Sequence, residues 1–168
     1  VTCRDWFQLS LKEGLTVFRE HQFATAMGSP GVQRIQHVRL LRSAQFPEDA
    51  GPMAHPVRPE SYVEINNFYT ATVYAKGAEV IRMYHTLLGA DAFHHGVKRY
   101  LTRYDGQAAT IEAFLSCMEE ASEVDLEQFS LWYSQAGTPR VEIRDSYDPQ
   151  HGCYTLYCRQ QLTPLPGA

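Results

Sequence analysis

Hydrophobic side chains recur three and four residues apart through the first three quarters of the chain, a period typical of helices that pack one face on a core. The pattern predicts helices over residues 6–27, 31–42 and 68–88, a fourth capped by Asp91 and a fifth capped by Thr110. A capping box of Asp125 and Gln128 predicts the start of a sixth, which continues through Tyr133. We expect three apolar stripes to face inward: Val73, Val80, Ile81, Tyr84, Leu87 and Leu88; Phe93, Val97, Leu101 and Tyr104; Ile111, Phe114, Leu115 and Met118. The predicted fold class is mainly α.

The period changes after Gly137-Thr138-Pro139. Val141 and Ile143 alternate with polar residues, residues 148–152 form a turn, and alternation resumes from Tyr154, so the segment predicts a β-hairpin. Because a lone hairpin is marginally stable in water, we interpret residues 138–168 as the start of a second, β-rich domain that follows a helical domain of residues 1–137. Residues 162–168, with two prolines, are expected to form a ragged end.

Four prolines fall within residues 43–62 and predict an extended loop, since proline removes backbone donors and blocks helix. An irregular segment of that length is uncommon in a compact domain unless it is functional or packs on another element.

Glu13 places a carboxylate on an apolar helical face with Trp6, Leu9 and Val17. We expect this face to be buried, and a buried carboxylate needs a cation, hydrogen-bond donors or a metal ion. An arginine or a set of backbone donors is the ordinary solution, and a metal ion is the alternative.

Composition narrows the classes of partner. The net charge of -4 comes from interspersed acids and bases without a basic stripe, which argues against nucleic acid. No apolar run is long enough to cross a bilayer, so no membrane partner is expected. The four cysteines form no C-x-x-C pair, and we interpret them as reduced thiols in a cytoplasmic protein, although Cys153 and Cys158 could pair.

Considered one at a time, few residues or short motifs of the chain indicate a catalytic or binding site. No two of the seven histidines lie at i,i+4 on one helix, so we interpret them as surface or supporting residues. The chain has no glycine-rich phosphate loop and no G-x-S-x-G segment. Tyr74 precedes Gly77, a glycine inside a predicted helix, which suggests close approach of another element.

Four segments taken in order carry a family resemblance: Lys12-Glu13-Gly14-Leu15-Thr16; residues 66–70, NNFYT; residues 73–80, VYAKGAEV; and residues 132–139, WYSQAGTP. Together they resemble the bacterial aminopeptidase N family of zinc metallopeptidases over essentially the whole chain. The resemblance implies the helical C-terminal lobe of a thermolysin-like catalytic domain, followed by the start of a β-sandwich-like domain. It also implies that Glu13 is the third zinc ligand and that Tyr74 donates a hydrogen bond to the developing oxyanion.

The chain lacks the H-E-x-x-H motif, which in this family supplies two histidine ligands and the general base, and which would fall just before Val1. It also lacks the Gly-x-Met-Glu-Asn segment that binds the substrate α-amino group. We therefore expect a fragment of an enzyme whose substrates are peptides. By itself it should bind no catalytic zinc, cleave nothing and require the remainder of the parent polypeptide.

Two alternatives remain at this point. One is a non-enzymatic helical module that binds a protein partner through its exposed apolar face, including the proline-rich loop. The other is a different reaction on the same scaffold, since relatives of this family can open epoxides.

Overall fold

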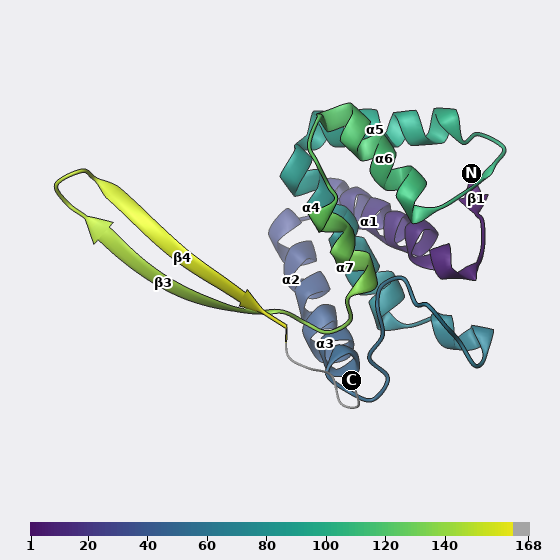
Figure 1. Ribbon diagram of the computed structural model, residues 1–168, viewed down its shortest axis with the longest axis horizontal. Helices are drawn as coiled ribbons and strands as arrows, with labels where there is room; N and C mark the ends of the chain where they lie inside the picture. The colour runs from purple at the N-terminus through teal and green to yellow at the C-terminus, as the bar shows by residue number, and fades with distance from the viewer. Residues whose placement is uncertain (163–168) are drawn as a thin grey trace.

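The computed structural model describes residues 1–162 and consists of a helical body from which a two-stranded ribbon projects (Figure 1). Two of the turns between helices, residues 41–45 and 72–76, have π-helical geometry, and a long segment that contains one 3₁₀ turn separates α3 from the second of them. In chain order the elements are β1 (Thr2–Cys3), α1 (Leu9–Met27), α2 (Pro30–Leu40), α3 (Phe46–Asp49), α4 (Gly77–Leu88), α5 (Ala90–Arg103), β2 (Ala108–Ala109), α6 (Ile111–Ser122), α7 (Leu131–Ser134), β3 (Arg140–Asp148) and β4 (Cys153–Gln161).

The core lies where α1, α4, α5 and α6 meet, and it is built largely from aromatic side chains. Phe18 of α1 packs edge-to-face on Phe93 of α5, with ring centroids 5.6 Å apart. Tyr84 of α4 packs in the same way on Phe114 of α6, at 5.8 Å. All four side chains are at most 1% exposed, so this cluster supplies the main hydrophobic stabilisation of the body.

The predicted fold class, mainly α, is confirmed. Some of the predicted helix starts and caps differ from those in the structure. Helix α4 follows the π turn Thr72–Lys76, whereas Phe68 belongs to a separate 3₁₀ turn, so the helix predicted over 68–88 begins later. Thr110 caps α6 as predicted, its side chain accepting the Ala113 N–H. Asp91 is not a cap, because Gly89 occupies that position and Asp91 lies in the first turn.

Two predicted inward residues face solvent. Leu101 is 49% exposed because the buried face of α5 passes through Phe93 and Tyr100, which places Leu101 about 100° further around the helix. Leu87, in the last turn of α4, is 57% exposed. Trp6 is 43% exposed, against the expectation for its face, because it belongs to the 3₁₀ turn before α1.

The sixth predicted helix is shorter and broken. A 3₁₀ turn, Gln128–Ser130, is followed by the four-residue α7. The predicted capping box is wrong, since Asp125 accepts the Glu127 N–H in a local turn instead.

The segment predicted as a loop over 43–62 is only partly irregular. Residues 46–49 form α3, because Pro47 lies in the first turn, where a helix tolerates proline. The remainder packs on the body: Val57 is fully buried and the Arg58 N–H donates to the Tyr133 carbonyl at 2.9 Å.

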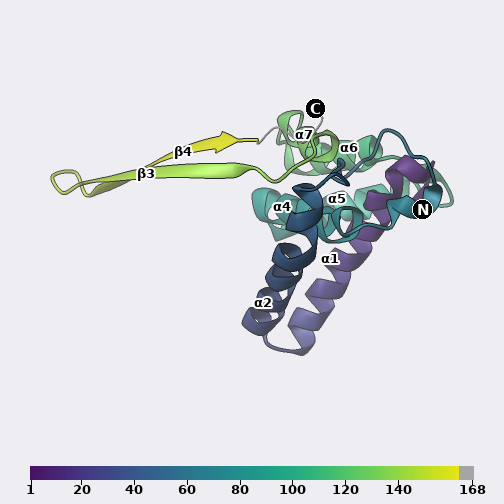
Figure 2. The ribbon, with the colours of Figure 1, turned by 90° about the horizontal axis from the view of Figure 1, so that it is seen from below.

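The β-hairpin is confirmed. Strands β3 and β4 are antiparallel with Ile143 opposite Cys158 and Tyr147 opposite Tyr154. Every residue of both strands is exposed, and the ribbon extends away from the helices in both views (Figures 1 and 2). The ragged end and the last part of the 138–168 domain prediction lie outside the described residues.

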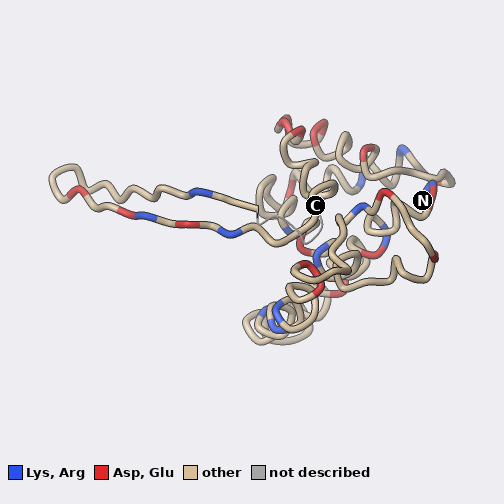
Figure 3. The backbone as a smooth tube through the Cα atoms, turned by 60° about the horizontal axis from the view of Figure 1, so that its bottom comes forward, with Lys and Arg blue, Asp and Glu red and all other residues tan. Residues whose placement is uncertain are grey.

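The surface carries both signs of charge interspersed along the chain, as Figure 3 shows. The four cysteines are free thiols. Within residues 1–162, no helix is both long and apolar enough to span a membrane.

Candidate active site

The site begins at a close crossing of α1 with the start of α4. A Cβ added to Gly14 would lie 2.7 Å from the carbonyl carbon of Gly77, so the backbones can approach this closely only because Gly14 has no side chain. The expectation that Gly77 marks a close approach is confirmed. Because Glu13 precedes one glycine and Tyr74 lies three residues before the other, the crossing brings these two predicted site residues together.

Glu13 is held in a largely buried position by its helix but has a weak ionic partner. Its side chain is 15% exposed, and Oε1 lies 2.8 Å from Nζ of the adjacent Lys12, whose side chain is 57% exposed. A flexible, exposed lysine contributes little to an ion pair. Among the described residues, the ion pair of Glu13 is therefore with this exposed lysine and not with an arginine.

Tyr74 lies in the π turn that leads into α4, with its ring 6.4 Å from that of Tyr69. Partial burial of the phenol and then the negative charge of Glu13 raise the pKa of Tyr74 above its ordinary value. The phenol therefore stays protonated at neutral pH and is suited to donate a hydrogen bond.

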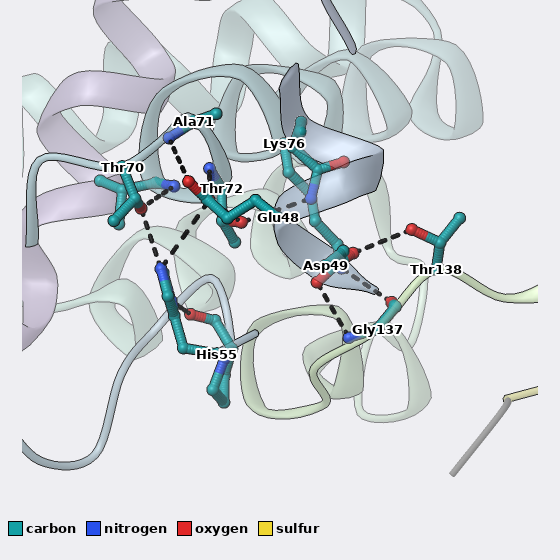
Figure 4. A network of polar contacts seen from close by, with 12 residues as sticks. Glu48, Asp49, His55, Thr70, Ala71, Thr72, Lys76, Gly137 and Thr138 are labelled. Carbon is teal, nitrogen blue, oxygen red and sulfur yellow. Dashed lines mark hydrogen bonds and ion pairs between the residues drawn. The ribbon is translucent and has the colours of Figure 1, made fainter. Parts of the chain in front are cut away.

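The start of the Tyr74 turn is anchored by Glu48 of α3 (Figure 4). Its carboxylate accepts the Thr72 N–H at 2.7 Å, the Ala71 N–H at 3.3 Å and the Thr72 hydroxyl. These N–H groups have no partner within the helix, because the first turn of a helix leaves its donors free. Glu48 thus acts as a cap supplied from another element.

His55 completes this end of the turn. Its Nδ1–H donates to the Pro56 carbonyl at 2.7 Å, so Nε2 accepts the Thr70 hydroxyl at 2.9 Å. The Thr70 oxygen in turn accepts the Val73 N–H at 3.1 Å. The loop that contains His55 is therefore joined to the backbone beside Tyr74.

The other end of the turn is anchored by a buried ion pair (Figure 4). Lys76 Nζ donates to Asp49 at 2.7 Å and to the Gly137 carbonyl at 2.9 Å, while Asp49 also accepts the Gly137 N–H and the Thr138 hydroxyl, each at 3.0 Å. Burial alone would raise the pKa of Asp49, but the hydrogen bond and charge of Lys76 outweigh it and lower that pKa. Adjacent carboxylates of α3 thus hold both ends of the Tyr74 turn.

The sequence did not reveal this anchoring network. Glu48 and Asp49 lie within the segment predicted as loop, and Lys76 is 27 residues from Asp49 along the chain. The signal in the sequence was the adjacent acids Glu48 and Asp49 and a lysine, Lys76, within an apolar helical pattern. Local periodicity cannot predict that residues so far apart along the chain form an ion pair.

The chain is similar to known proteins over most of its length. Residues 1–133 match the family described as "Peptidase family M1 domain". The chain is 58% identical to Aminopeptidase N of Escherichia coli over 166 residues, which cover 99% of this chain and 19% of the relative. It is also 58% identical to Aminopeptidase N of Haemophilus influenzae over 164 residues, again covering 19% of that protein.

Two solved structures have a similar fold. Legionella pneumophila aminopeptidase A in complex with aspartic acid superimposes with a TM-score of 0.79 and 31% identity, covering 95% of this chain and 18% of that one. An M1 zinc metallopeptidase mutant from Deinococcus radiodurans, bound to a Tyr-Ser-Ala substrate, gives a TM-score of 0.60 at 19% identity, over 79% of this chain and 28% of that one. The chain spans about a fifth of the length of these two aminopeptidase N relatives.

Proposed function

Since the chain belongs to peptidase family M1, we propose that it is part of a zinc aminopeptidase that removes N-terminal residues from peptides. The observation that carries the proposal is the pairing of an inward carboxylate, Glu13, with a protonated phenol, Tyr74, at a helix crossing that Gly14 makes possible. The relatives that match are named as aminopeptidases, so we do not retain the interaction module as a second candidate.

Glu13 would hold the metal ion as one of its protein ligands. A single carboxylate does not bind zinc tightly, and the chain contains no H-E-x-x-H segment, so the histidine ligands must come from elsewhere in the complete polypeptide. When bound, the zinc would supply Lewis-acid polarisation of the substrate carbonyl and a water of lowered pKa.

Tyr74 would stabilise the negative charge that develops on the carbonyl oxygen. Its hydroxyl keeps its proton because burial and Glu13 raise the pKa, and a donor fixed in place is worth most when the charge appears only in the transition state. The hydrogen bonds of Glu48 and Asp49 prevent the turn from shifting, so no reorganisation is needed during the reaction.

We test this with Tyr74→Phe in the complete polypeptide that carries this chain. We expect kcat for an aminoacyl substrate to fall about 10²–10³-fold with little change in KM, because only a transition-state interaction is lost. The matched control is Tyr69→Phe, an exposed ring 6.4 Å away, which should leave kcat unchanged. Near-normal turnover of Tyr74→Phe would remove the oxyanion role.

Glu13→Gln tests the ligand role separately. The variant should lose zinc from the catalytic centre and lose activity, because a neutral amide is a poor zinc ligand, whereas the exposed Glu60→Gln should retain both. Stoichiometric catalytic zinc in the folded Glu13→Gln variant would contradict the assignment.

Two further expectations belong to the proposal. The hairpin has one apolar face, to which Val141, Ile143, Tyr154 and Leu156 contribute from opposite strands, and this supports a second β-rich domain beginning near residue 138. The free thiols support a cytoplasmic location, which cell fractionation would test.

A further inference from the structure

Outside the candidate active site, α1 and α2 bring two imidazoles together. The helices run side by side (Figure 2), and the rings of His21 and His37 stack with centroids 3.4 Å apart and planes 15° from parallel. Glu20 precedes His21 on α1, and its Oε2 lies 3.7 Å from His21 Nε2. One ligand atom from each of the three side chains lies within 4.8 Å of the others.

The stack occurs where hydrophobic packing is weak. Helix α2 contributes no buried residue, and Val32 and Ile35 on it are more than half exposed. His21 is nevertheless only 8% exposed. A buried imidazole stacked on a half-buried one contributes little hydrophobic stabilisation, but it brings the ring nitrogens of two helices and the Glu20 carboxylate close together.

We propose that Glu20, His21 and His37 form a binding site for a divalent transition metal ion, with Zn²⁺ as the representative ion. Imidazole nitrogen and carboxylate oxygen are ligands that Zn²⁺, Ni²⁺ and Cu²⁺ favour, whereas Mg²⁺ and Ca²⁺ prefer oxygen alone. Three protein ligands leave a position open to water.

Binding requires one imidazole to rotate, because an ion lies in the plane of each ring that binds it and the two rings are stacked nearly parallel. His37 is the ring that can move, since it lies on α2, which contributes no buried residue. Tetrahedral zinc with bonds of about 2.0–2.1 Å places its ligand atoms about 3.3 Å apart, so the three atoms must close from within 4.8 Å of one another. Glu20, with a side chain 63% exposed, is free to change rotamer toward the histidines. Burial and the proximity of His37 lower the pKa of His21 to about 4, which keeps its ring neutral and able to coordinate.

The surrounding charges come mainly from α2 and α4. Arg82 Nη2 lies 3.2 Å from His21 Nδ1, and because a guanidinium can only donate, a bound ion must displace this contact or take the opposite nitrogen. Glu79 offsets the positive charges, since it accepts from Arg34 at 2.6 Å and from Arg82 at 3.3 Å. The local balance therefore permits a dication while limiting its affinity.

The site is separate from the one proposed for catalysis. Glu20 lies seven residues after Glu13 on α1, about 10.5 Å along the helix axis. An ion shared by α1 and α2 would tie α2 to the body, which few other contacts do. The inference uses neither Glu13 nor Tyr74 and does not depend on the peptidase proposal.

The experiment measures Zn²⁺ binding by the 168-residue chain, purified without a histidine tag and carrying Glu13→Gln. We expect about one Zn²⁺ per chain by calorimetry, visible absorption bands of a nitrogen-coordinated ion with Co²⁺, and a higher melting temperature with Zn²⁺. His37→Asn should weaken binding at least tenfold and abolish the shift. His95→Asn, an exposed histidine of α5, is the matched control and should change neither.

Circular dichroism would check that each variant remains folded. His21→Asn is the second variant; if its burial prevents folding, His37→Asn, on the surface helix α2, decides alone. Absence of Zn²⁺ binding to the folded chain, or unchanged binding in His37→Asn, would overturn the inference. Zinc that binds the unsubstituted chain but not Glu13→Gln would belong to Glu13 and would also overturn it, while leaving the peptidase proposal intact.

Discussion

The helical body and the β-hairpin both follow their hydrophobic patterns, yet they use apolar residues in opposite ways. In the body, Phe18, Tyr84 and Phe114 are at most 1% exposed, whereas in the hairpin Ile143 and Tyr154 are 62% and 60% exposed. Periodicity therefore predicts the type of element and which residues share a face, but burial depends on whether another surface covers that face. Substitutions at matched positions in the helical body and in the hairpin would test this difference.

The largest difference is expected for core truncation. Phe114→Ala should lower the free energy of unfolding of the chain by about 3–5 kcal/mol, because it empties the centre of the aromatic cluster. Ile143→Ala in the hairpin should change it by less than about 0.5 kcal/mol. Urea denaturation followed by circular dichroism measures both. A comparable loss for Ile143→Ala would show that the apolar face of the ribbon is covered in solution.

The second comparison concerns ion pairs. Lys76→Met should cost about 3 kcal/mol, because it leaves the Asp49 carboxylate buried without its cation. In the hairpin, His151→Asn removes the partner of Asp148, an exposed pair, and should leave the melting temperature unchanged within error. Equal effects of the two substitutions would mean that the buried network contributes no more than a surface contact.

The third comparison separates steric from conformational roles of glycine. Gly14→Ala should destabilise the body by about 1–3 kcal/mol, because the new methyl group would meet the Gly77 backbone. Gly152, at the hairpin turn, has open space around it but a φ of +64°, so Gly152→Ala should cost about 1–2 kcal/mol of hairpin stability.

Asparagine distinguishes the two causes, since it tolerates positive φ but not the crowding at the helix crossing. Gly152→Asn should restore the hairpin, read as strand content by nuclear magnetic resonance, whereas Gly14→Asn should be worse than Gly14→Ala. Failure of Gly152→Asn to recover the hairpin would exclude backbone conformation as the cause.

The smallest effect is a pH dependence. Because the pKa of Asp49 is lower in the folded chain than the unfolded value of about 3.9, the unfolded state binds the proton first as the pH falls. The stabilisation is therefore complete above about pH 4 and is lost as the pH falls through the folded pKa. The melting temperature of Asp49→Asn should depend less steeply on pH below 4. Asp105→Asn, an exposed carboxylate in the turn after α5, is the control and should retain the original slope.

The sequence predicted α1, α5, α6 and the hairpin with small errors at their ends, since each has a long uniform period or a clear alternation. It failed where local signals conflict with tertiary structure. Proline favours a loop over residues 43–62, yet Pro47 lies in the first turn of α3. The spacing of apolar residues in α5 predicts that Leu101 is buried, but the buried residue is its neighbour Tyr100.

The candidate site was predictable only in part. Glu13 and Tyr74 came from family resemblance, and the glycine inside the helical pattern indicated the crossing beside them. The anchoring by Glu48 and Asp49 could not be predicted, because it joins segments 23 to 89 residues apart along the chain. The stacked histidines were missed for the same reason, since they lie on different helices.

The π turn before α4 has a consequence for how this scaffold can vary. A π turn contains one residue more than an α turn, so it rotates the side chains before it by about 100° relative to those after it. Deleting Ala75 would therefore leave Ile81 and Tyr84 in the core while swinging the phenol of Tyr74 away from Glu13. In such a scaffold, gaining or losing a single residue can redirect the chemistry without any change in the packed interior.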